Sequence, residues 1–131
     1  MKRSVAVFDI DGTIFRSSLI IELVDALIME GVFPKSVRRN YAKEYNRWLE
    51  RKDSYDKYIM GVVRAYVRNI KGVSQPKIWK VAHKVMAFHQ NRVYRFTRDL
   101  VKELKKKKYY LIAISNSPLD IVQPFAHAMG F

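Results

Sequence analysis

Two short apolar runs, one near each end of the chain, constrain the fold most. Residues 4–8 run into Asp9-Ile10-Asp11-Gly12, and residues 109–114 run into Ser115-Asn116-Ser117-Pro118. A short, continuously apolar run that enters a polar loop is typical of a strand buried on both faces. Each loop leads into a helical pattern. This order favours parallel strands in an α/β sheet. Sheets of this kind bind their ligands at the carboxyl ends of the strands.

The long stretch between the two runs has helical periodicity. The apolar spacing, together with capping serines and the glycines at 31, 72 and 130, predicts helices with a break near Asn91. We expect them over residues 18–29, 34–49, 54–70, 74–90, 92–108 and 118–129. Ser17 or Ser18 can cap the first of these helices.

This insertion is too long for a simple crossover between two strands. We therefore expect two parts. Residues 18–88 form a separate helical cap, and residues 1–17 and 89–131 form the core that carries the sheet. Residues 92–108 return the chain to the second strand.

Composition narrows the class of protein. The 131 residues include no cysteine, which excludes thiol catalysis and cysteine-ligated zinc and suits a reducing, cytoplasmic location. No apolar run reaches the roughly 18 to 20 residues that span a bilayer, and the N-terminus does not have the pattern of a signal peptide. The three histidines have no i,i+4 pair, and His89 fits a packed position better than a ligand position.

The net charge of +13 belongs to the middle of the chain. Residues 34–108 carry 22 basic and six acidic groups, whereas both flanking segments are slightly acidic. A basic segment rich in tyrosine and tryptophan is compatible with binding of nucleic acid or an anionic membrane. The aromatic residues follow helical spacing, however, so the favoured interpretation is that they form the core of the helical segment.

The acid pair after the first run is the main candidate for chemistry. Asp9 and Asp11 are spaced i,i+2 at a strand end, so both side chains can point to one side. Such a pair suits a hard cation such as Mg²⁺. It also suits nucleophilic attack by one carboxylate, with the other as general acid and base. A simple Asx turn is the structural alternative. A calcium-binding loop is disfavoured, because the sequence does not carry the later ligand residues that such a loop needs.

Residues 5–14, Val-Ala-Val-Phe-Asp-Ile-Asp-Gly-Thr-Ile, resemble the first signature of the haloacid dehalogenase superfamily of phosphohydrolases. Residues 112–117, Ile-Ala-Ile-Ser-Asn-Ser, resemble its second signature. The resemblance implies a Rossmann-like parallel sheet with an inserted α-helical cap. The position and helicity of that insert are similar to those of the phosphoserine-phosphatase-like branch.

The resemblance also implies roles for individual residues. Asp9 would be the nucleophile that forms an aspartyl-phosphate, Asp11 the general acid and base, and both would bind Mg²⁺, Asp11 through its backbone carbonyl. Ser115 would bind the substrate phosphate, helped by Asn116, Gly12 and Thr13. The implied activity is Mg²⁺-dependent hydrolysis of a small phosphorylated metabolite.

Two parts of the superfamily pattern are missing. A cationic side chain and a further acidic pair should follow the second signature, yet the 16 residues after Ser115 hold no Lys or Arg and one acid, Asp120. We therefore expect either a piece of a longer protein, cut after the second motif, or a degenerate member. Ser18 stands where the phosphoserine enzymes carry a substrate-binding acid, which weakens that substrate assignment.

Two other functions remain open on the sequence alone. One is the non-catalytic basic module that binds nucleic acid or anionic membrane. The other is the N-terminal part of a multifunctional lipid-modifying enzyme.

Overall fold

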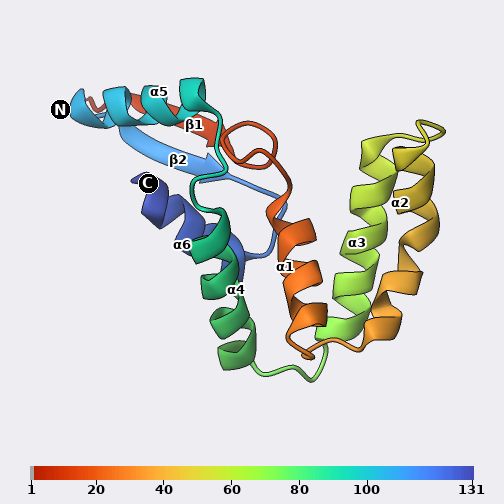
Figure 1. The fold of residues 1–131 in the computed structure, drawn as a ribbon. Coiled ribbons are helices and arrows are strands. Elements are labelled where there is room, and N and C mark those ends of the chain that lie inside the picture. Colours follow the sequence, from red (N-terminus) through yellow and green to blue (C-terminus); the bar gives the residue numbers. More distant parts are fainter. Residues whose placement is uncertain (1) are drawn as a thin grey trace. The chain divides into compact units, whose positions relative to one another are not determined.

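The computed structural model describes residues 2–131, and the chain divides into two compact units. The first comprises the residues up to Leu19 together with Ala82–Phe131, and the second comprises Ile20–Val81. The elements in chain order are β1 (Val5–Asp9), α1 (Leu19–Met29), the 3-10 helix η1 (Lys35–Asn40), α2 (Ala42–Leu49), α3 (Tyr55–Ile70), α4 (Gln75–His89), α5 (Arg95–Lys106), β2 (Tyr110–Ile114) and α6 (Leu119–Met129) (Figure 1).

The first unit is an α/β unit built on a parallel pair of strands. β1 and β2 run side by side, with Val5 opposite Tyr110 and Asp9 opposite Ile114 (Figure 1). The predicted strands and their parallel order are confirmed. Their register matters for function, because the loops that follow both strands start at the same end of the sheet.

One face of this sheet is uncovered, which corrects the expectation that both strands are buried on both faces. In β1, Phe8 is buried and Ala6 is half-buried. In β2, Leu111 and Ala113 are half-buried. The exposed apolar side chains are Val5, Val7, Tyr110, Ile112 and Ile114. They share one face because side chains alternate along a strand and these positions are paired in the register. The described helices of this unit cover the other face only.

The core of the first unit lies behind the loop that follows β1. Phe15 is fully buried, and its ring meets that of Phe125 of α6 edge to face, with ring centres 5.4 Å apart. Phe15 also meets the half-buried ring of His89, at 6.2 Å. His89 is thus a packed residue, as predicted.

The second unit is all helical, and α2 and α3 lie side by side in it (Figure 1). The predicted helix over residues 54–70 is confirmed, with the Ser54 hydroxyl accepting a hydrogen bond from the Lys57 backbone N–H. The prediction of a single helix over residues 34–49 is wrong. This segment is divided into η1 and α2 by Tyr41, whose φ of −133° is not helical and whose side chain is buried. Burial of this tyrosine outweighs helix propensity.

Aromatic rings form part of the core of the second unit, as the helical spacing predicted. Tyr41 and Tyr58 are buried, and Trp48 stacks on Tyr58 with ring centres 5.4 Å apart and an angle of 14° between the ring planes. Offset or tilted ring pairs of this kind stabilise a core beyond the area they bury.

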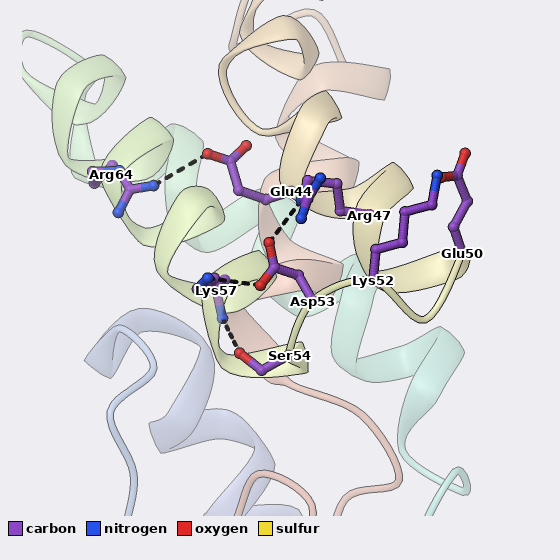
Figure 2. A network of polar contacts seen from close by, with 8 residues as sticks. All are labelled: Glu44, Arg47, Glu50, Lys52, Asp53, Ser54, Lys57 and Arg64. Carbon is purple, nitrogen blue, oxygen red and sulfur yellow. Dashed lines mark hydrogen bonds and ion pairs between the residues drawn. The ribbon is translucent and has the colours of Figure 1, made fainter.

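Ion pairs join α2 to α3 on the surface of the second unit (Figure 2). The Asp53 carboxylate accepts from Arg47 Nε at 2.7 Å and from Lys57 Nζ at 2.6 Å. Arg64 Nη2 lies 3.5 Å from Glu44 Oε1. Hydrogen bonds from Lys57 and Arg47 lower the pKa of the Asp53 carboxyl to about 2.

None of the helices described in residues 2–131 combines the length and the apolar character that a bilayer span requires.

Candidate active site

The candidate site starts where β1 ends. Asp9 is the last residue of the strand, and the following Ile10 N–H donates to the Ile114 carbonyl at 3.1 Å, which extends the parallel pairing by one step. The chain then turns sharply, since the Ile10 carbonyl accepts from the N–H groups of Thr13, Ile14 and Phe15.

Gly12 makes this turn possible. Its φ of +77° lies in the left-handed region that glycine adopts at little cost. Its N–H donates within the loop, to the Phe15 carbonyl at 2.9 Å and the Ser17 carbonyl at 3.2 Å. The loop after β1 is therefore a closed, internally bonded structure.

The segment before α5 fixes this loop from outside. The Tyr94 N–H donates to the Ile14 carbonyl at 2.9 Å, and the Arg16 N–H donates to the Arg92 carbonyl at 3.0 Å. The Thr97 hydroxyl of α5 donates to the Thr13 carbonyl at 2.8 Å. These bonds join segments far apart in sequence, so the loop geometry depends on the folded unit.

Asp9 is exposed at the strand end and has one polar neighbour of note. The Thr13 hydroxyl donates to Asp9 Oδ2 at 2.8 Å. This bond orients the carboxylate through one of its two oxygens. An exposed, oriented carboxylate is the arrangement that a nucleophile or a metal ligand requires.

Asp11 is half-buried and accepts hydrogen bonds from three donors. Its Oδ2 accepts from the Ser115 hydroxyl in a short hydrogen bond, and its Oδ1 accepts from the Ser117 hydroxyl at 3.0 Å. The third donor is the backbone N–H of Leu19, the first residue of α1, at 2.7 Å from Oδ1. Asp11 therefore caps α1 from outside that helix, a role the sequence had suggested for Ser17 or Ser18.

Sequence reasoning missed Ser117. Besides donating to Asp11, it directs its backbone N–H to the Ser115 hydroxyl at 3.0 Å. The two serines are spaced i,i+2 after β2, as the two aspartates are after β1. That repeated spacing was the signal that could have identified Ser117.

The residues predicted to bind phosphate lie at this end of the sheet, but most of their donors are already engaged. The Ser115 hydroxyl donates to Asp11, the Thr13 hydroxyl to Asp9 and the Gly12 N–H to the Phe15 carbonyl. Asn116 is exposed. A phosphate would have to replace some of these hydrogen bonds, so the assignment of these four residues stays a prediction.

The donor set at this end of the sheet fits Mg²⁺ in kind. Mg²⁺ takes hard oxygen ligands and needs one or two carboxylates, with water and substrate phosphate completing the shell. Asp9 offers an exposed carboxylate, whereas the Asp11 carboxylate is occupied by its three donors and has its backbone carbonyl to offer. Across residues 2–131, no group of three or more histidine or acidic side chains is placed to hold a metal ion.

One of three comparisons with known proteins identifies a family for this chain. No curated protein and no solved structure matches the chain. The family model of haloacid dehalogenase-like hydrolases, in contrast, matches residues 4–131, which include both strand ends and the helical insert. The chain therefore belongs to the haloacid dehalogenase-like hydrolase family.

Proposed function

We propose that this hydrolase cleaves phosphate monoesters through an aspartyl-phosphate formed on Asp9. The observation that carries the proposal is the unequal setting of the two acids. Asp9 is exposed and oriented by one hydroxyl, whereas Asp11 is half-buried and held by three donors. The exposed Asp9 carboxylate is accessible to phosphorus, which suits a nucleophile. Two of the three partners of Asp11 are hydroxyls that can accept as well as donate, which suits a group that gains and loses a proton.

In the first step an Asp9 oxygen attacks phosphorus, and the bond between phosphorus and the ester oxygen breaks. The leaving oxygen takes a proton from Asp11, which acts as general acid. In the second step Asp11 takes a proton from water, whose oxygen attacks phosphorus. Inorganic phosphate leaves, and the Asp9 carboxylate is restored.

The serines after β2 allow Asp11 to change its protonation state. A hydroxyl is both donor and acceptor, so rotation of the Ser115 or Ser117 hydroxyl lets a protonated Asp11 donate to it. The Leu19 N–H cannot reverse in this way and continues to hold Oδ1. We thus assign Ser115 and Ser117 to the positioning of Asp11, with Ser115 free to turn to a phosphoryl oxygen after it releases Asp11.

Mg²⁺ would be held by the Asp9 carboxylate and the Asp11 backbone carbonyl, and when bound it would neutralise the charge of the phosphoryl oxygens. Thr13 supports this arrangement because it fixes one Asp9 oxygen and thereby orients the other.

We further infer that the first unit is part of a Rossmann-like core and that the second is a helical cap. The division of the chain at Leu19 and Ala82 supports a cap close to the predicted residues 18–88. A cap after the first signature fits the phosphoserine-phosphatase-like branch and a small phosphorylated metabolite as substrate.

The test is hydrolysis of p-nitrophenyl phosphate with and without Mg²⁺. The wild-type protein should release nitrophenol in a Mg²⁺-dependent reaction, and Asp9→Asn should lower kcat by at least about a thousandfold, as removal of a nucleophile does. Asp99→Asn is the matched control, because Asp99 is an exposed acid of α5 paired with Arg98. It should retain wild-type turnover.

Wild-type turnover in the Asp9→Asn variant would show that Asp9 is not the nucleophile. Hydrolysis that needs no divalent ion would remove the metal from the proposal while leaving the aspartyl-phosphate open to direct detection by mass spectrometry.

A further inference from the structure

The second unit contains a cavity that the proposed reaction does not use. Its volume is about 320 Å³, within the range of small-molecule sites. Side chains from α1, η1, α2 and α3, and from the junction between η1 and α2, converge on it. They are Asp25, Arg38, Tyr41, Ala42, Tyr45 and Tyr58.

A half-buried carboxylate, that of Asp25, lines the cavity. Asp25 projects from α1, and its Oδ1 accepts from the Tyr41 hydroxyl at 3.2 Å. Burial holds the pKa of Asp25 above its ordinary value, although the Tyr41 hydrogen bond and the charge of Arg38 act to lower it. A carboxylate that has lost part of its hydration gains from a cation that enters beside it.

Aromatic rings line the same cavity. Tyr41 and Tyr58 are buried, and burial raises the pKa of both phenols well above the usual value, so they stay neutral. Tyr45 is partly exposed, and its ring centre lies 5.1 Å from that of Tyr58. Neutral phenol rings around a carboxylate make a favourable setting for an ammonium group, because their faces attract cations.

Arg38 adds the opposite charge. It is exposed, lines the cavity and is close enough to influence Asp25 electrostatically. A guanidinium at the edge favours an anionic group on the ligand. Carboxylate, aromatic rings and guanidinium together define a ligand with a cationic end and an anionic end.

We propose that this cavity of the second unit binds a small zwitterion, with its ammonium group against Asp25 and the tyrosine rings and its anionic group against Arg38. The site is built without Asp9 or Asp11, so the proposal stands independently of the hydrolytic mechanism.

Three probes separate the parts of the proposal, each titrated into the protein and followed by ligand-observed NMR. Glycine betaine carries both charges, tetramethylammonium carries the cation alone, and acetate carries the anion alone. Betaine should bind saturably and most tightly, tetramethylammonium more weakly, and acetate least. Asp25→Asn should weaken betaine binding by about tenfold or more, as expected for loss of a charged partner beside aromatic rings.

Arg38→Gln should reduce betaine binding to the level of tetramethylammonium, whose own binding should be unchanged or stronger. Tyr45→Leu serves as a second variant in case Asp25→Asn disturbs folding, since Tyr45 is partly exposed. It should weaken both quaternary ammonium probes. Asp56→Asn, an exposed acid of α3 that does not line this cavity, should change nothing.

Absence of saturable betaine and tetramethylammonium binding would overturn the proposal. So would betaine binding that survives both Asp25→Asn and Tyr45→Leu. Equal loss of binding in Asp56→Asn would also overturn it, because the effect would then reflect overall charge. Hydrolytic activity is not read in any of these experiments, so a failure of the Asp9 mechanism leaves their outcome unaffected.

Discussion

Asp11 of the first unit and Asp53 of the second have partners at very different distances along the sequence. In the first unit, Asp11 is bonded to Ser115 and Ser117, which are 104 and 106 residues away. In the second, Asp53 is bonded to Arg47 and Lys57, six and four residues away. Contacts between distant segments carry a larger loop-closure entropy than local ones, so they form only when packing elsewhere brings the segments together. The candidate active site is therefore a product of the folded first unit, whereas the ion pairs of the second belong to one local hairpin.

The largest expected effect comes from the core behind the long-range site. Phe125→Ala should destabilise the protein by about 3–5 kcal/mol, because it removes a fully buried ring that packs on Phe15. Urea unfolding followed by circular dichroism measures the free energy. Hydrogen exchange should show that amides of α5 and α6 lose more protection than amides of α3. Phe96→Ala, at an exposed phenylalanine of α5, is the control and should have little effect. Equal loss of protection in both units would erase the contrast.

Removal of a donor from Asp11 should have the next largest effect. Ser115→Ala takes a hydroxyl from a half-buried carboxylate and an acceptor from the Ser117 N–H, so we expect a cost of about 1–3 kcal/mol. The adjacent Asn116→Ala changes an exposed side chain of the same loop and should be nearly neutral. The measurement is again the free energy of unfolding in urea. A neutral Ser115→Ala would mean that water replaces the serine without cost.

A smaller effect is expected where an aspartate of the second unit has a single phenol donor. Tyr41→Phe removes the hydrogen bond to Asp25 and should cost about 1 kcal/mol, less than Ser115→Ala, because one bond is lost and the cavity admits water. Tyr45→Phe is the matched control, since it removes the hydroxyl of a partly exposed tyrosine at the same cavity. A cost equal to or above that of Ser115→Ala would reverse the ranking of the two aspartates.

The smallest expected effect is that of the exposed ion pairs, and it depends on pH. Hydrogen bonds from Lys57 and Arg47 lower the pKa of Asp53 from its ordinary value of 3.8 to about 2 in the folded protein. The resulting stabilisation is present above pH 3.8 and is lost as the pH falls toward 2. Asp53→Asn should thus be slightly less stable than wild type at neutral pH, and the difference should vanish near pH 2.

Thermal unfolding of both proteins across this pH range, at low and high salt, checks the prediction. Glu50→Gln, which alters another exposed ion pair of the same hairpin, is the control and should show a weaker pH dependence. A difference that persists at low pH would mean that Asp53 acts through shape and hydrogen bonding instead of charge.

Most of the local structure could be predicted from the sequence. Periodicity with a capping serine and a following glycine placed α3, and the proline and glycine at residues 118 and 130 bounded α6. The apolar runs gave both strands and their parallel order. These features are local, because each is set by spacing, caps and turn residues within one segment. The division at Tyr41 was missed since a buried side chain, and no local signal, interrupts the helix there.

The sequence by itself determined that Asp9 and Asp11 lie at the carboxyl end of a strand, because the apolar run before them and the glycine after them are local signals for a strand and a turn. Only the tertiary structure decided which groups surround these acids and which surfaces and cavities the chain forms elsewhere. The Ser117 and Leu19 bonds to Asp11, the uncovered face of the sheet and the cavity around Asp25 all depend on which distant segments meet. That choice follows from burial of the core, which a one-dimensional pattern of residue types does not specify.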